Sequence, residues 1–145
     1  MRSFPLLLVL VGLAYGGHPK LKACGTESKA EIVYVNVGNC DSDPCEIERG
    51  NSTNFSIGVI PHVNSETVTL DARVSLIWGV TMKIPGLETN LCRFISCPVV
   101  AERKYEVSQS FTISQLVPSM STTVTFKVIG DVGEIACYAI DIKIV

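Results

Sequence analysis

The chain has 145 residues, of which 12 are Lys or Arg and 14 are Asp or Glu, so its formal net charge is −2 with His neutral. It has no block of basic residues with which to bind nucleic acid or an anionic membrane surface. Hydrophobic residues make up 47% of the chain. The length suits a single domain of common size with one hydrophobic core.

The N-terminus has the layout of a secretory signal peptide. MRSFPLLLVLVGLAYGG carries one positive charge at Arg2, then an apolar run, then small residues on both sides of Tyr15, as a cleavage site requires. The apolar run is too short to span a bilayer, although an N-terminal membrane anchor is the alternative. The sequence therefore predicts a signal peptide over 1–16 and a secreted, extracellular domain over 17–145.

The first half of the predicted domain contains two short strand patterns and two glycosylation patterns. Apolar and polar side chains alternate in EIVYVNV (31–37) and in NFSIGVIPHV (54–63), which predicts two strands. Asn51 and Asn54 each begin an Asn-x-Ser/Thr acceptor pattern for N-linked glycan. Asn51 follows a predicted turn and is the more accessible acceptor, whereas Asn54 adjoins the apolar side chains of a strand.

The next segment, VTLDARVSLIWGVTMKI (68–84), alternates over an unusual length. Every even-numbered position from Val68 to Ile84 is apolar, and the odd positions are polar or small except for Ile77. At about 3.3 Å per residue a straight strand of this length would be longer than a small domain is wide. We therefore expect it to bend near Arg73 or at Gly79, where a bulge or a close approach is tolerated.

Three further strand patterns complete the chain. They are KYEVSQSFTI (104–113), TVTFKVI (123–129) and YAIDIKI (138–144), and the last two are joined by a predicted hairpin turn over 130–133. Enrichment in Val, Ile and Thr, turn residues between the segments and the absence of a helical stripe all predict an all-β chain. Such a chain forms a two-sheet β-sandwich or a closed barrel.

The six cysteines predict a disulfide framework. They stand at 24, 40, 45, 92, 97 and 137, and six cysteines allow fifteen pairings. Cys40–Cys45 and Cys92–Cys97 are C-x4-C loops short enough to close locally, which leaves Cys24 to pair with Cys137. The alternative is a zinc site built from the two C-x4-C pairs.

The cysteine order and its surrounding motifs resemble those of the ML (lipid-recognition) domain family. CEIERG (45–50), IPGLETNLCRFISCPVV (84–100) and VIGDVGEIAC (128–137) are similar to segments of the group-two mite allergens and, less closely, to the sterol carriers linked to Niemann–Pick type C disease. The resemblance implies an immunoglobulin-like two-sheet sandwich opened into a lipid-binding cup, with the same disulfide pairing. It also implies that the protein could act as an allergen.

The resemblance further implies which residues contact the lipid. In the sterol carriers, apolar side chains at the pocket mouth match Ile84, Ile113 and Val117 of this chain. The third of these is aromatic in the carriers, so Val117 departs from the pattern, places sterol in doubt and leaves fatty acids as candidates. Further wall candidates, each of which could instead be ordinary core, are Val80, Met82, Tyr105, Val107 and Phe126.

The residues give little support for catalysis. Neither His18 nor His62 stands near a nucleophile in sequence, and the chain has no G-x-S-x-G or H-E-x-x-H motif. Asp41 and Asp43 supply too few oxygens for Ca²⁺ and are interpreted as a solvated turn. With all cysteines paired, no thiol nucleophile remains. We expect no enzymatic activity, no cofactor and no metal site.

Two functional hypotheses follow. The first is a secreted, monomeric lipid-binding and transfer protein that holds a sterol, a fatty acid or a similar lipid, and that delivers it to an acceptor protein or receptor. The second is a recognition module of the innate-immunity type, which acts through protein contacts and bacterial lipid. The lysosomal lumen is an alternative destination. A small hydrolase is a distant third reading.

Overall fold

The structure is a computed structural model, and it describes residues 21–25, 28–38, 40 and 44–145. The predicted signal peptide over 1–16, His18, Asp41 and Asp43 therefore lie outside the described residues. Within them, no helix is long and apolar enough to cross a membrane.

Strands dominate the described chain, as the alternating patterns predicted. In chain order they are β1 (Lys22–Ala23), β2 (Ala30–Val37), β3 (Cys45–Ile47), β4 (Ser52–Pro61), β5 (Val68–Ser75), β6 (Thr81–Lys83), β7 (Tyr105–Thr112), β8 (Met120–Gly130) and β9 (Gly133–Ile144). Two single-turn 3₁₀ helices, η1 (Ile77–Gly79) and η2 (Leu91–Arg93), lie in the connections. The predicted all-β class is confirmed.

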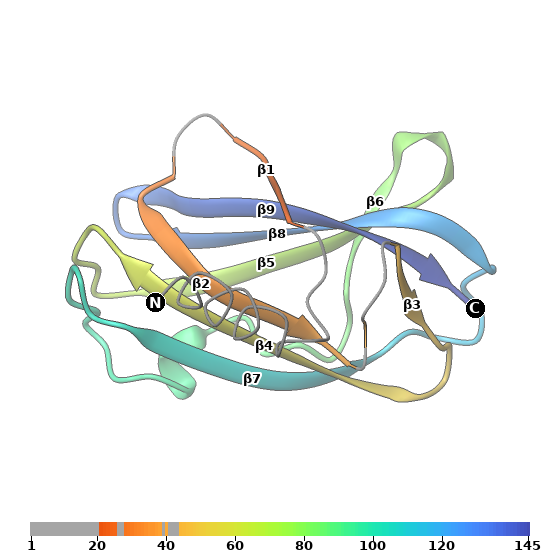
Figure 1. Cartoon of the computed structure of the whole chain (residues 1–145), viewed down its shortest axis with the longest axis horizontal. Helices are drawn as coiled ribbons and strands as arrows, with labels where there is room; N and C mark the ends of the chain where they lie inside the picture. The colour runs from red at the N-terminus through yellow and green to blue at the C-terminus, as the bar shows by residue number, and fades with distance from the viewer. Residues whose placement is uncertain (1–20, 26–27, 39, 41–43) are drawn as a thin grey trace, which may run out of the picture.

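The strands form two sheets that face each other. The larger has the order β1-β9-β8-β5-β6, with β3 added in parallel to β9, and the smaller has the order β2-β4-β7. Figure 1 shows β5, β8 and β9 running along one layer and β4 and β7 along the other, with the strands close to the long axis of the molecule. This is the predicted two-sheet sandwich.

The inner faces of the two sheets form one hydrophobic core. Even-numbered residues of β5 and β8 and odd-numbered residues of β4 and β7 point inward, because side chains alternate along a strand. The most deeply buried side chains include Ile135, Ile142 and Ile144 of β9, each exposed by 2% or less.

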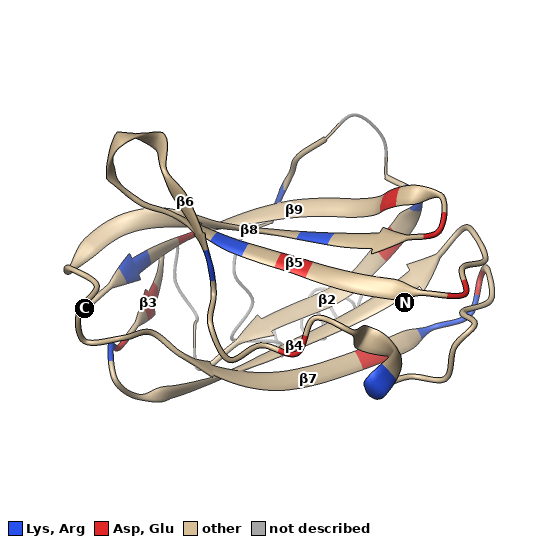
Figure 2. Cartoon of the chain, turned by 180° about the vertical axis from the view of Figure 1, so that it is seen from behind, with Lys and Arg blue, Asp and Glu red and all other residues tan. Residues whose placement is uncertain are grey.

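On the outside of the molecule, Lys and Arg are interspersed with Asp and Glu along the strands and loops (Figure 2), in agreement with the absence of a basic block in the sequence.

The segment 68–84 changes direction at Gly79, one of the two expected positions, but it does so by reversing into a second strand and not by bending within one strand. The chain reverses through η1 and returns as β6, which pairs antiparallel to β5 with Arg73 opposite Lys83 and Ser75 opposite Thr81. Trp78 (φ 68°) and Gly79 (φ 73°) both adopt the left-handed conformation that turns the chain. A period-two pattern continues through such a turn, so it did not distinguish a bend from a reversal.

The disulfide pairing is the one expected. Cys24 is bonded to Cys137, Cys40 to Cys45 and Cys92 to Cys97. The first of these joins residues 113 positions apart and fixes β1 beside β9. Because all six sulfurs are in disulfides, the zinc alternative fails for lack of thiolate ligands. The turn between β8 and β9 is also as predicted, with Gly130 paired to Gly133.

Candidate functional site

The space between the two sheets contains two small apolar cavities. Cavity 1 has a volume of about 40 Å³. The smaller sheet contributes Phe55, Ile57, Val59, Pro61, Tyr105 and Val107 to its wall. The larger sheet contributes Val68, Leu70, Val128 and Ile135, and the segment around the second C-x4-C loop contributes Leu91, Ile95 and Val99.

Cavity 2 has a volume of about 20 Å³ and lies further along the same sheets. Its wall is made of Val37, Ile47, Phe55, Ala72, Ile84, Leu87, Phe111, Val124, Phe126 and Ile140. Neither cavity exposes a polar atom of its lining. Apolar cavities of this kind stay dry and accept apolar guests, because water has no partner in them. The site can therefore bind an apolar guest by desolvation and shape.

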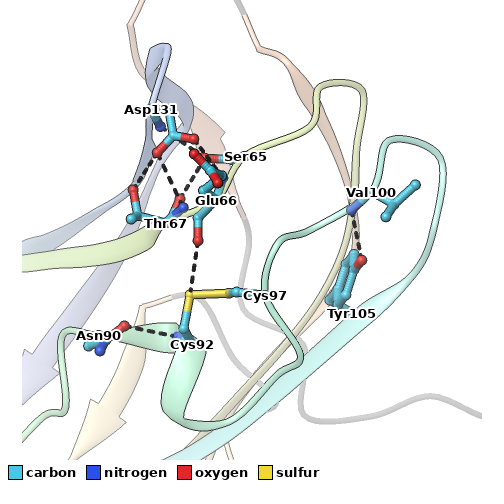
Figure 3. The surroundings of a disulfide bond; sticks show 9 residues. All are labelled: Ser65, Glu66, Thr67, Asn90, Cys92, Cys97, Val100, Tyr105 and Asp131. Atoms are coloured by element: carbon cyan, nitrogen blue, oxygen red, sulfur yellow. Dashed lines mark hydrogen bonds between the residues drawn. A yellow bond between two sulfur atoms is a disulfide. The ribbon is translucent and has the colours of Figure 1, made fainter.

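Cavity 1 lies beside what we call the Asp131 end, formed by residues 62–67, 91–100 and 130–133. The Asp131 carboxylate accepts hydrogen bonds from the Thr67 hydroxyl at 2.6 Å and from the Glu66 and Thr67 amides at 2.6 and 3.2 Å (Figure 3). The Thr67 hydroxyl, followed by the Glu66 amide, lowers the pKa of Asp131 from its ordinary value of 3.8. This carboxylate thus ties the β4–β5 loop to the β8–β9 turn.

Ser65 fills the space beneath this turn. It is 2% exposed, and its hydroxyl donates to the Thr67 carbonyl at 2.6 Å and accepts from the Asp131 amide at 2.9 Å. A Cβ at Gly130 would lie 2.5 Å from the Ser65 hydroxyl, so only glycine permits this approach. Two backbone hydrogen bonds join Ser65 to Val99, just beyond the Cys92–Cys97 disulfide.

The opposite end, which we call the Arg49 end, is formed by residues 47–50, 113–120 and 145. The Arg49 guanidinium donates to the carbonyls of Val117 at 3.0 Å and Val145 at 3.2 Å. The Gly50 amide donates to the carbonyl of Ile113 at 2.8 Å. The loop after β7 is therefore attached to the rest of the molecule by a few hydrogen bonds.

The residues predicted to contact lipid fall into three groups. Tyr105 and Val107 line cavity 1, and Ile84 and Phe126 line cavity 2. Ile113 is buried and Val117 is half-buried against the core at the Arg49 end, outside both linings. The third group is Val80 and Met82, which lie on the β5–β6 hairpin with exposed fractions of 55% and 37%.

Val80 and Met82 do not reach the inter-sheet space because the hairpin extends past the strands that would cover them. Only three residues of β6 pair with β5, and neither Val80 nor Met82 contributes to either cavity. In contrast, Phe55 lines both cavities and was not among the predicted wall residues. Its alternation with Ile57 and Val59 in β4 was the signal that placed it on the apolar face.

The other predicted sites are at the surface. The Asn51 side chain is exposed and donates to the Glu48 carboxylate at 3.1 Å, and that of Asn54 is exposed on β4 and accepts from the Ser110 hydroxyl at 2.6 Å. His62 is exposed, with Nδ1 2.9 Å from a Glu102 carboxylate oxygen. The described part of the chain has no group of three His, Cys, Asp or Glu side chains placed to hold a metal ion.

The family model of the ML domain matches residues 19–144. The chain belongs to the ML domain family. The mite group 2 allergen Lep d 2 of Lepidoglyphus destructor is 32% identical over 137 residues, covering 94% of this chain and 94% of the relative. The NPC intracellular cholesterol transporter 2 of Canis lupus familiaris is 26% identical over 141 residues, covering 96% and 93%.

A solved structure of an ML-type fold agrees with the architecture. The Niemann–Pick type C2 protein from the Japanese carpenter ant superposes with a TM-score of 0.76 at 20% identity, covering 87% of this chain and 99% of that one. At this identity the likeness establishes the fold. The apolar inter-sheet space described above is therefore a feature of an ML domain, and the resemblance noted in the sequence is confirmed.

Proposed function

We propose that this ML domain binds a lipid, such as a fatty acid or a sterol, between its two sheets and carries it as a secreted, monomeric protein. The observation that carries the proposal is the pair of wholly apolar cavities between the inner faces of the two sheets. Three disulfides are typical of proteins that fold in an oxidising compartment. The relation to a protein named as a cholesterol transporter supports the same function.

The cavities hold little free volume, so a lipid must displace side chains or separate the sheets. The driving force is desolvation of the lipid, about 25 cal/mol for each Å² of apolar surface removed from water. An apolar wall discriminates weakly between chains that differ by a methylene. The apolar wall by itself thus gives little selectivity, and the partners of the proposed carrier are the lipid and an acceptor protein or receptor.

The proposal is tested first by native mass spectrometry of protein secreted from eukaryotic cells, followed by extraction and identification of bound lipid. We expect a mass excess that matches a fatty acid or a sterol. The same spectra show whether residues 1–16 are removed and whether Asn51 or Asn54 carries glycan. A lipid-free protein that also fails to take up added oleic acid and cholesterol would contradict lipid carriage and favour a recognition module that acts through protein contacts.

Two isoleucines give a matched pair of variants for the same assay. Ile84 is 9% exposed in the wall of cavity 2, whereas Ile77 is 63% exposed on the hairpin. We expect Ile84→Asp to abolish uptake of oleic acid, because a carboxylate in the wall must be desolvated, and Ile77→Asp to leave uptake unchanged. Circular dichroism of both variants verifies that they are folded. Equal uptake by both would exclude Ile84 from the lipid site.

A further inference from the structure

Among the residues that the structure describes, Phe55 alone lines both cavities. It lies on the inner face of β4, is 8% exposed, and pairs with Gln109 of β7 at the middle of the smaller sheet. A side chain in this position has unfilled space on two sides, whereas protein interiors are in general packed as densely as organic crystals.

The two cavities lie end to end along the strands. On β5, Val68 and Leu70 line cavity 1, and Ala72, the next inward residue, lines cavity 2. On β8, which runs in the opposite direction, Val128 lines cavity 1 and Val124 lines cavity 2. The same order on two strands of one sheet places cavity 1 toward the Asp131 end and cavity 2 toward the Arg49 end.

An aromatic pair separates the cavities. The Phe55 ring, from the smaller sheet, meets the Phe126 ring, from the larger sheet, edge to face with centroids 5.7 Å apart and planes at 72°. Phe126 is also stacked on Tyr138, at 6.3 Å and 30°. Phe126 borders cavity 2 but is held on its sheet by a second ring, whereas Phe55 has free volume on two sides. Of the two rings, Phe55 is the one with more room to turn.

Hydrogen bonds and a disulfide close each end of the sandwich. The Asp131 end is held by the Cys92–Cys97 disulfide and by the buried hydroxyl of Ser65. The Arg49 end is held by hydrogen bonds from Arg49 and Gly50 to loop carbonyls, with the Cys40–Cys45 disulfide beside them. A surface hollow at the Arg49 end shares Val37 and Ile47 with the wall of cavity 2. A ligand that enters from this hollow reaches cavity 2 before cavity 1.

We propose that Phe55 divides the lipid site into an outer and a deep compartment and thereby selects narrow, unbranched chains. A short chain occupies the outer compartment around cavity 2 and leaves Phe55 in place. A long chain reaches the deep compartment around cavity 1 only when the Phe55 ring turns aside, and a rigid ring system would have to displace Phe126 as well. This inference rests on the proposed lipid binding and adds the residue that governs how far a chain enters.

The test compares decanoic acid with palmitic acid on delipidated wild-type protein and two leucine variants. Phe55→Leu removes a ring from the partition, and Phe111→Leu removes a ring from the wall of cavity 2 alone. Both phenylalanines are nearly equally buried, at 8% and 7% exposed, so the packing loss is matched. Affinities are measured by isothermal titration calorimetry, and thermal unfolding verifies that each variant is folded.

We expect Phe55→Leu to raise the ratio of palmitate affinity to decanoate affinity by about tenfold, because long chains no longer have to displace a ring. Phe111→Leu should leave that ratio within about twofold of wild type. An unchanged affinity ratio in Phe55→Leu, or an equal rise in both variants, would overturn the proposal that Phe55 divides the site. Lipid binding itself would stand. If wild-type protein binds neither acid but takes up cholesterol, the proposed role of Phe55 is overturned and lipid binding stands. If it binds neither acid nor cholesterol, the proposed function fails as well.

A second measurement needs no variant. Palmitic acid labelled at its terminal methyl should show nuclear Overhauser contacts to Val68 and Ile135 in cavity 1. Decanoic acid labelled in the same way should show contacts to Val124 and Ile140 in cavity 2. Contacts of both methyls to the same cavity would contradict the two-compartment arrangement.

Discussion

The Asp131 end and the Arg49 end close the same sandwich by different means. At the Asp131 end, one carboxylate and one buried hydroxyl bind two loops together, with a disulfide beside them. At the Arg49 end, one guanidinium binds two carbonyls of separate segments, also with a disulfide nearby, Cys40–Cys45. The comparison teaches that one sandwich can be closed by an anion that gathers backbone amides at one end and by a cation that gathers backbone carbonyls at the other.

The largest expected effect comes from removing the covalent link at the Asp131 end. Cys92→Ala/Cys97→Ala opens a loop with a sequence separation of 5, which by loop entropy should lower the free energy of unfolding by about 2 kcal/mol. Urea denaturation measures it, and hydrogen exchange should show faster exchange of the Val99 and Ser65 amides with little change at Gly50. An equal increase in the rate of hydrogen exchange at both ends would show that the two ends do not open independently.

A smaller effect is expected at the Arg49 end. Arg49→Met keeps an unbranched side chain but removes the hydrogen bonds to Val117 and Val145, and should lower the free energy of unfolding by about 1–2 kcal/mol. Arg93→Met is the control, since Arg93 is exposed and pairs only with Glu88 among the contacts described. It should stay within about 0.5 kcal/mol of wild type. Equal losses of unfolding free energy in the two variants would show that the Arg49 hydrogen bonds do not hold this end closed.

The smallest effect is one of pH, at the Asp131 end. Because hydrogen bonds lower the pKa of Asp131 in the folded state, its contribution is present above the ordinary value of 3.8 and is lost as the pH falls through the lowered value. Asp131→Asn should therefore be less stable than wild type at neutral pH, and the difference should shrink as the pH falls below 3.8. Thermal unfolding as a function of pH measures it.

Asp141, whose pKa is lowered by Lys22 and Thr123, titrates in both proteins and cancels in that comparison. A difference that persists unchanged into acid would mean that the Asp131 charge contributes nothing to closing the end. Arg49→Met offers the contrast, because an arginine stays protonated over this range and its effect should not depend on pH.

Alternation in the sequence predicted the sheets well because a buried face imposes a period of two on any strand. The pattern around Ile57 and Val107 predicted inward-facing side chains, and the turn at 130–133 was identified from its glycines. The same logic misplaced Val80 and Met82. Whether an apolar face is covered depends on how far the partner sheet extends, and periodicity carries no information on that length.

The closures at the two ends were beyond sequence reasoning for a different reason. Ser65 and Asp131 are 66 residues apart and are ordinary turn residues taken singly, so their hydrogen bonds exist only once the loops meet. Phe55 was visible as an inward-facing residue of β4, yet its place between two cavities depends on the position of Phe126 in the other sheet. Both the closure of the ends and the position of Phe55 thus depend on contacts between residues that are distant in the sequence.

The position of Trp78 has a practical consequence for fluorescence measurements of unfolding. It is the only tryptophan of the chain, and it is 91% exposed at the tip of the β5–β6 hairpin. Its fluorescence emission should therefore resemble that of free indole in water both before and after unfolding. The fluorescence of Trp78 depends on the hairpin and changes little when the core unfolds. Unfolding curves recorded with it would therefore show a transition of small amplitude. Near-ultraviolet circular dichroism of Tyr138 and its ring neighbours is the optical probe that reads the interior.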